Sequence, residues 1–251
     1  MNIAALRGVI AGSVAAAACL LLSAQGSAAT PRPDFTGVWT NAGAPGIGGA
    51  TRAAPTPLPF KPQAQARVHA FEELMKPTGD SPGGWCLGYG MPGSMLNSGG
   101  YPMEIIQRPD QLTIIYEAHG ETRHVYLGKR NAPQADRVPG RNGYSSAHWE
   151  GDTLVVETDN LVDQVDQRYA HSDQATVVER YHLEAKPDAQ GRRVLVADMV
   201  MTDPAFYTAP VSAQKKWAEV PNGRLLPYEC AEEVWTQHLE EMAKKAGVPV
   251  P

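Results

Sequence analysis

The sequence predicts a mainly β fold, an antiparallel barrel or strongly curved sheet with one or two covering helices. Between residues 103 and 203, short segments alternate apolar and polar side chains, which is typical of half-buried strands. These segments occur in pairs separated by turn residues, as in β-hairpins. Helical apolar spacing is found on either side of this region, at 62–76 and 231–246.

The first 29 residues are expected to be an export signal. Arg7 supplies a positive start, residues 9–22 are almost wholly small or apolar, and Ala28-Ala29 offers the small residues that a signal peptidase needs. Cleavage near Ala28-Ala29 predicts a secreted or periplasmic protein. Lipoprotein anchoring at Cys19 is the alternative, although the preceding residues lack the leucine that usually begins a lipoprotein cleavage box.

Residues 30–251 are expected to form one β-rich domain, a usual size for a barrel or sandwich. The chain has a formal net charge of −5 and its basic residues are scattered, which argues against a nucleic acid partner. No segment after the signal is long and apolar enough to span a bilayer. Two cysteines remain after the signal, Cys86 and Cys230, and in an oxidising compartment we expect them to form a disulfide. Two unconnected thiols are the alternative.

The N-terminal part of the domain is predicted to be mostly irregular. A short strand at 34–40 is followed by a loop rich in Gly, Ala and Pro at 41–61, then by a helix at 62–76 that Pro77 ends. A second long loop, 78–102, contains Cys86. Loops this long in a compact domain are typically lids or binding loops, or are disordered.

Seven further strands are predicted, and they make up most of the sheet: 103–108, 111–118, 121–127, 144–149, 152–159, 175–184 and 193–202. Their order in successive hairpins predicts a meander. A two-residue turn at His119-Gly120 would place Tyr116 opposite Arg123. An irregular segment, 203–227, then leads to the C-terminal helix at 231–246, which Gly247 ends.

Two motifs resemble known families. Gly37-Val38-Trp39, on the first strand, resembles the Gly-x-Trp of lipocalins, which implies a calycin-like barrel. The stretch from Trp149 to Thr158, Trp-Glu-Gly-Asp-Thr-Leu-Val-Val-Glu-Thr, is similar to a large family of secreted bacterial proteins of unassigned function. That resemblance implies export and a β-rich domain but no reaction. The long Pro/Gly loops depart from the lipocalin pattern.

Three charged residues, Arg123, Glu179 and Asp198, are predicted on otherwise apolar strand faces. An isolated buried charge is costly, so each needs a partner, a ligand or water. One interpretation is a catalytic site in which Arg123 and Tyr116 hold a ligand oxygen and Glu179 moves a proton, with Asp198 in support. The alternative is a structural ion pair between Arg123 and Glu179.

Histidines and aromatic residues supply the other candidates. His171, in a turn before a strand, is a second possible proton carrier, with Asp166 or Asp173 to orient it. Ligand contacts are expected from aromatic side chains, namely Tyr181, Tyr207 and Trp149.

No cofactor and no metal are expected, because the sequence lacks a nucleophile elbow, a zinc-protease motif, a phosphate loop and a dinucleotide fingerprint. A metal held by His119, His124 and Glu117 is the alternative. The leading functional hypothesis is a secreted, cofactor-independent enzyme that acts on a small lipophilic or aromatic molecule by proton transfer, as a lyase, hydratase, isomerase or ether-cleaving hydrolase. The rivals are a periplasmic small-molecule carrier and an envelope interaction module.

Overall fold

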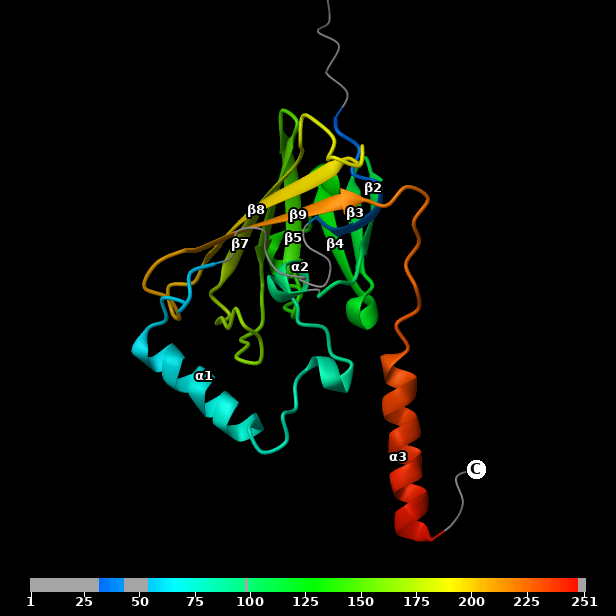
Figure 1. Cartoon of the computed structure of the whole chain (residues 1–251). Helices are drawn as coiled ribbons and strands as arrows, with labels where there is room; N and C mark the ends of the chain where they lie inside the picture. Colours follow the sequence, from blue (N-terminus) through cyan, green and yellow to red (C-terminus); the bar gives the residue numbers. More distant parts are fainter. Residues whose placement is uncertain (1–31, 43–53, 98, 248–251) are drawn as a thin grey trace, which may run out of the picture. The chain divides into compact units, whose positions relative to one another are not determined.

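A closed β-barrel forms the body of the protein (Figure 1). The computed structural model describes residues 32–42, 54–97 and 99–247. The expected export signal, and most of the expected loop 41–61, lie outside the described residues. The predicted fold class is confirmed, since the described residues form a mainly β barrel accompanied by a few helices.

The barrel contains nine described strands, and each pairs with the next in sequence. The strands are β1 (Gly37–Asn41), β2 (Met103–Arg108), β3 (Gln111–Tyr116), β4 (Glu121–Leu127), β5 (Tyr144–Glu150), β6 (Thr153–Asp159), β7 (Thr176–Leu183), β8 (Val194–Thr202) and β9 (Val211–Glu219). Strand β1 pairs with both β2 and β9 and so closes the barrel. Closure satisfies the backbone groups that an open sheet edge would expose.

One strand pair departs from the expected meander. Strands β4 and β5 run parallel, with Val125–Leu127 paired to Ser145–Ala147. A parallel pair needs a crossover connection, here provided by a segment with two short 3₁₀ turns, η3 (Gly128–Arg130) and η4 (Gln134–Asp136). The sequence shows the strands on both sides of this segment but not their relative direction.

The expected register of β3 and β4 is wrong by two residues. Tyr116 pairs with Glu121, and Arg123 pairs with Ile114. The cause is a turn longer than two residues, which includes the 3₁₀ turn η2 (Ala118–Gly120) with His119 at a left-handed φ of 61°. Because strand side chains alternate with a period of two, this shift leaves every residue on its expected face.

Strand β9 lies within the segment expected to be irregular. Its inward residues, Val211, Ala213, Lys215 and Trp217, are all buried. Lys215 interrupts the apolar alternation at the centre of the strand, and this hides the strand in the sequence. Strand β9 is therefore recognised from its pairing with β1 and β8, which closes the barrel.

The predicted helices are confirmed as α1 (Pro62–Met75) and α3 (Cys230–Ala246). On α1, the inward stripe is Ala64, Val68, Phe71 and Met75; only Ala64 is buried, and the other three are partly exposed. None of the helices in the described part of the chain combines the length and apolar character needed to cross a membrane.

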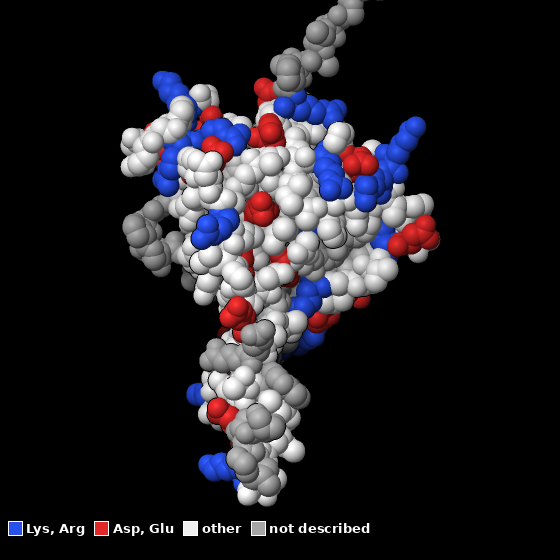
Figure 2. Space-filling model, turned by 90° about the vertical axis from the view of Figure 1, so that its right-hand side faces the viewer, with Lys and Arg blue, Asp and Glu red and all other residues white. Residues whose placement is uncertain are grey.

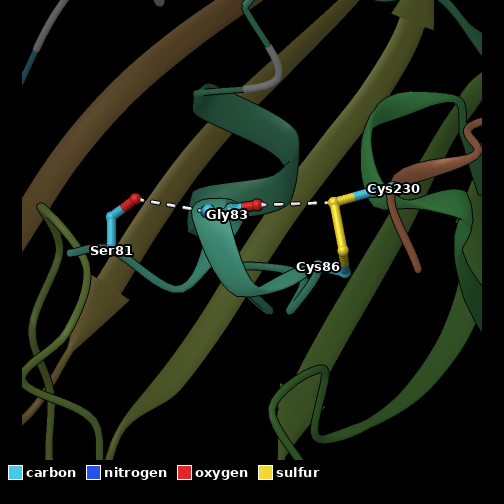
Figure 3. The surroundings of a disulfide bond; sticks show 5 residues. Ser81, Gly83, Cys86 and Cys230 are labelled. Atoms are coloured by element: carbon cyan, nitrogen blue, oxygen red, sulfur yellow. Dashed lines mark hydrogen bonds between the residues drawn. A yellow bond between two sulfur atoms is a disulfide. The ribbon is translucent and has the colours of Figure 1, made fainter. Parts of the chain in front are cut away.

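The expected cysteine pair is confirmed (Figure 3). Cys86 follows the 3₁₀ turn η1 (Gly83–Trp85), Cys230 begins α3, and their Cα atoms are 5.5 Å apart. The Sγ of Cys230 also lies 3.8 Å from the carbonyl oxygen of Gly83. The disulfide therefore ties the start of α3 to η1 across 144 residues of sequence.

A short helix, α2 (Gly93–Leu96), fills part of the barrel interior. All four of its residues are buried, and the sulfur of Met95 lies 3.5 Å from the Tyr181 hydroxyl. The Ser94 hydroxyl donates to the Glu121 carboxylate on β4. A Cβ added at Gly93 would lie 2.5 Å from Oε1 of Gln167, so this helix fits closely against its surroundings.

Charged side chains are spread over the molecular surface. Figure 2 shows basic and acidic residues interspersed on the face in view, with no concentration of either sign. This distribution agrees with the scattered bases of the sequence.

Candidate functional site

Arg123 and Glu179 form a buried ion pair inside the barrel, with exposed fractions of 2% and 0%. Nη1 of Arg123 donates to Oε1 of Glu179 at 3.0 Å, and Nη2 donates to Oε2. The two parallel bonds match the planar guanidinium to the planar carboxylate. The structure therefore contains the ion pair between Arg123 and Glu179, which was the alternative to an arginine that binds a ligand.

Neighbouring side chains bond to the remaining polar atoms of the pair. Nε of Arg123 donates to Ser145 at 3.0 Å, and Nη2 donates to Thr158 at 2.8 Å. The Tyr181 hydroxyl donates to Oε1 of Glu179 at 2.7 Å. Burial alone would lower the pKa of Arg123, but the Glu179 carboxylate more than offsets this and the pKa is raised. Arg123 therefore remains charged, and the pair is held in place by side chains from several strands.

Tyr116 lies beside this network and is 2% exposed. Its hydroxyl makes no well-formed hydrogen bond among the described residues, although the charges of Arg123 and Glu179 both act on it. Burial raises the pKa of the Tyr116 phenol, and burial with the Glu179 charge raises the pKa of Tyr181. Both phenols are therefore neutral at ordinary pH and able to donate a proton.

Asp198 does not join the cluster, and its predicted inward placement is wrong. The inward residues of β8 are its neighbours Ala197 and Met199, both buried, whereas Asp198 is partly exposed on the opposite face. There it accepts a hydrogen bond from Gln214 at 2.8 Å. Because both faces of β8 begin apolar, the alternation in the sequence did not identify the inner face.

His171 is buried away from solvent rather than exposed in a turn, with an exposed fraction of 0%. Its Nδ1 lies 3.1 Å from the carbonyl oxygen of Ser172, and its Nε2 lies 3.1 Å from that of Met91. The expected partner Asp166 instead accepts two bonds from Arg141, at 3.0 and 3.1 Å. Burial lowers the pKa of His171, which favours the neutral ring.

The three expected ligand contacts are separated. Tyr181 belongs to the ion-pair cluster. Tyr207 donates to the carbonyl oxygen of Ala170 at 2.7 Å and stacks on Phe60 at 4.7 Å between ring centroids. Trp149 packs against Phe35, with ring centroids 5.5 Å apart. The structure thus brings together Arg123, Glu179, Tyr116 and Tyr181, and places Asp198, His171, Tyr207 and Trp149 elsewhere.

Lys215 is an inward-facing charged residue that the sequence analysis missed. It is 0% exposed, and burial lowers its pKa to about 8. Across the sheet its backbone partner is Ala197, whose partner on the other side is Tyr181. Recognition of β9 as a strand would have identified it, because Lys215 then falls on the same face as Ala213 and Trp217.

A pocket of about 580 Å³ lies beside α1, and we call it the α1 pocket. Its apolar wall combines one face of α1 with the segment that precedes the helix, and comprises Leu58, Phe60, Val68, Phe71 and Val165. Polar residues also line it, among them Glu72, Asp80, Asp166, Gln167 and Arg168. A pocket of this size lies within the range that holds small molecules.

Gln167 connects the α1 pocket to His171. It lines the pocket, is 7% exposed, and its Nε2 donates to the carbonyl oxygen of Tyr89 at 3.2 Å. The same nitrogen lies 3.3 Å from Nε2 of His171. The amide oxygen of Gln167 has no hydrogen-bond partner among the described residues. This oxygen is inaccessible and lies against α2, where a Cβ added at Gly93 would be 2.5 Å from it, so it does not face the pocket.

The histidines considered as metal ligands lie in separate surroundings. The ring of His119 packs between Tyr89 and Tyr228, at 5.4 and 5.1 Å. Nδ1 of His124 lies 3.1 Å from the amide nitrogen of Gln111. Within the described ranges, no group of three or more His, Cys, Asp or Glu residues is arranged to hold a metal ion.

Comparison with known proteins adds no family to this description. No protein-family model matches the chain, and no curated protein matches it significantly.

Proposed function

We propose that the protein is a lipocalin-like carrier that binds a small lipophilic or aromatic molecule in the α1 pocket. The observation that supports this function best is the pocket itself, about 580 Å³ in volume, in which an apolar wall meets polar side chains such as Glu72 and Asp166. Apolar walls with a few fixed polar groups are the usual construction of a small-molecule site.

The hydrogen bonds of the Arg123–Glu179 ion pair favour a binding function over a catalytic one. Glu179 accepts hydrogen bonds from Arg123 and Tyr181, and Arg123 donates to four oxygen atoms in the barrel. A general base needs to reach a substrate proton, and these bonds occupy the groups that would do so. The pair therefore serves first to hold β4 and β7 together.

A cofactor-independent proton-transfer enzyme is the second candidate, supported by the hydroxyl of Tyr116. In that scheme the neutral phenol donates to a substrate oxygen beside Arg123, and Glu179 carries the proton. The buried, unpaired hydroxyl is what such a donor requires before substrate arrives. Substrate would have to displace α2, whose Met95 contacts Tyr181.

The proposed location is outside the cytoplasm, in the periplasm or secreted. The expected export signal supports it, and so does the bond between Cys86 and Cys230, because disulfides persist mainly in oxidising compartments.

The binding site is tested with a neutral lipophilic fluorophore, N-phenyl-1-naphthylamine, titrated against the purified mature protein. Phe71→Ala should weaken binding by roughly tenfold, because the ring supplies part of the apolar wall. Leu74→Ala is the matched control, since Leu74 is on the same helix but 69% exposed and outside the pocket lining. Equal affinities of the fluorophore for the wild type, Phe71→Ala and Leu74→Ala would refute the assignment of the α1 pocket as the binding site.

Carrier and enzyme are separated by what happens to a bound compound. A carrier returns its ligand chemically unchanged after long incubation, as measured by mass spectrometry. An enzyme yields a product whose formation stops in Tyr116→Phe, a change that keeps the ring and removes only the hydroxyl. Ligand recovered unchanged from both proteins would exclude the enzyme for that compound.

A further inference from the structure

We infer that α3 pairs with α3 of a second copy of this chain, with the two helices antiparallel. No described residue of α3 lines the α1 pocket, so the pairing is independent of the binding function proposed above. None of the described residues of α3 belongs to the buried apolar core of the barrel or packs against it. The main contact of the helix with the rest of the chain is with η1, to which the disulfide joins it.

The apolar side chains of α3 are largely open to solvent. Met242 is 50% exposed, and Val234 and Leu239 are only partly buried. Among the described side chains of the helix, Ala243 alone is buried. An amphipathic helix of this length normally gains its stability by packing its apolar face on another element. Within the described part of the chain, that packing is missing for most of α3.

A hollow of about 400 Å³ lies where α3 meets η1. Trp85 forms one side of it and is 64% exposed, and Leu87, two residues further along the chain, is 44% exposed. The other side is a face of α3 that includes Ala231, Val234 and His238. Large apolar side chains exposed together at a hollow are typical of a surface that binds another protein.

The charges of α3 favour a second copy as the partner. The sequence has glutamates at 232 and 233, in the first turn of the helix, and lysines at 244 and 245, in its last turn. In an antiparallel pair, the acidic end of each helix lies beside the basic end of the other, whereas a parallel pair places like charges together.

The total charge of α3 disfavours an anionic membrane as the partner. Its sequence contains four glutamates and two lysines, a net charge of −2 with neutral histidine. Helices that bind anionic lipid surfaces are rich in lysine and arginine on their polar face. The apolar stripe of α3 is therefore better matched by a protein surface of complementary charge.

A two-fold axis at His238 gives the register that combines these features. Positions 232 and 244 are equally distant from 238, so they lie opposite each other in the pair. The same holds for Val234, which lines the hollow, and Met242. Met242 of the second copy is therefore the side chain expected to enter the hollow, where its thioether can contact the ring of Trp85.

The length of the helix limits the strength of the pairing. A helix of 17 residues is about 25 Å long. One pair of such helices forms an interface at the low end of the roughly 1,200–2,000 Å² that stable complexes bury. We therefore expect a dissociation constant in the micromolar range, with the monomer predominant in dilute solution.

Sedimentation equilibrium tests the pairing, on the mature protein with its disulfide intact, from low micromolar to submillimolar concentration. The wild type should show a monomer–dimer equilibrium. Met242→Glu should raise the dissociation constant at least tenfold, because it places a carboxylate at an apolar contact. Leu74→Glu is the matched control, because Leu74 is 69% exposed on α1, and this change should leave the constant as it is.

A charge exchange tests the antiparallel direction. The double variants Lys244→Glu/Lys245→Glu and Glu232→Lys/Glu233→Lys should each be monomeric, because each would bring like charges together. Mixed in equal amounts, they should form a dimer again, since a helix with two acidic ends then meets one with two basic ends. Added salt should weaken this mixed dimer. Circular dichroism of each variant checks that the helix is retained.

Four outcomes would overturn the inference. The first is a wild-type protein that stays monomeric over the whole concentration range. The second is a dimer that Met242→Glu leaves intact, which would place the interface elsewhere. The third is a mixture of the two charge variants that retain their helix but do not associate. The fourth is binding of the wild type to phosphatidylglycerol vesicles in place of self-association, which would assign the surface to a membrane.

Discussion

Arg123 on β4 and Glu179 on β7 meet through two parallel hydrogen bonds inside the barrel, although 56 residues separate them in the chain. They lie on strands that are not adjacent, with β5 and β6 between them in the sheet. The pair therefore links two strands of the wall that are three positions apart in the sheet. Loss of this ion pair should therefore destabilise the whole barrel.

Glu179→Gln should lower the free energy of unfolding by about 3–5 kcal/mol, because it keeps the shape of the side chain but leaves a buried guanidinium without its counter-charge. Urea denaturation at neutral pH measures the loss. Asp198→Asn is the control, since Asp198 is on the outer face of β8 and partly exposed. The control should change stability by less than about 1 kcal/mol. Similar losses in the two variants would contradict the assignment of inner and outer faces.

Tyr116→Phe and Tyr181→Phe should have opposite effects on stability. Removing the unpaired Tyr116 hydroxyl should be neutral or stabilising by up to about 1 kcal/mol, because a buried polar atom without a partner is unfavourable. Removing the Tyr181 hydroxyl breaks a 2.7 Å bond to Glu179 and should destabilise by about 1.5–3 kcal/mol. Thermal unfolding of both variants checks this. A loss in Tyr116→Phe as large as that in Tyr181→Phe would show that the first hydroxyl is also bonded.

Lys215 should make the protein more stable as the pH rises above about 8. Burial lowers its pKa to about 8 from an ordinary value of 10.5, so between these values the unfolded chain binds more protons than the folded one. Unfolding stability then increases with pH, by on the order of 3 kcal/mol over the full interval. Lys215→Met should lack this increase and be the more stable protein below the interval.

The measurement is the difference in urea midpoint between wild type and Lys215→Met at several pH values between about 7.5 and 9.5, below the range in which unfolded tyrosines ionise. Lys216→Met controls for the loss of a lysine, because Lys216 is the next residue on the outer face and is bonded to Glu184 at 2.5 Å. Parallel pH profiles for wild type and Lys215→Met would rule out a lowered pKa at this position.

Reduction of the disulfide should release α3 before it affects the barrel. The bond joins the start of α3 to η1, and most described residues of the helix are exposed, with Met242 at 50%. Few buried contacts remain to hold the helix once the bond is broken. Hydrogen exchange should therefore accelerate in 230–246 and stay slow in β7 and β8. Equal acceleration in helix and strands would mean that the disulfide stabilises the whole fold.

Where one face of a strand is polar, alternation in the sequence is sufficient to find its inner side. For this reason the alternation correctly predicts that Arg123 and Glu179 face the barrel interior. The register error of two residues at the η2 turn does not change these faces, because the side-chain period of a strand is two. On β8 the run Val194-Leu195-Val196 is apolar on both faces, so the alternation was ambiguous and Asp198 was misplaced.

The remaining differences between the predicted and the observed structure arise from contacts that the alternation of apolar and polar residues does not encode. The parallel pairing of β4 with β5 depends on the path of a long connection, and β9 is disguised by the buried Lys215. The α1 pocket combines residues of α1, such as Phe71, with residues of the connection between β6 and β7, such as Gln167, and no local pattern relates them. The bond between Cys86 and Cys230 could be expected because these are the two cysteines that follow the expected export signal.

The position of β1 between β2 and β9 has a consequence for how the chain reaches its native state. Among the described strands, the first to be synthesised is also the neighbour of the last, and its ladders to β2 and β9 each contain three residue pairs. The barrel closes only after residue 219 has been synthesised, and until then β1 and β8 present unpaired backbone groups at the open edges of the sheet. We therefore expect the incomplete chain to aggregate more readily than the closed barrel.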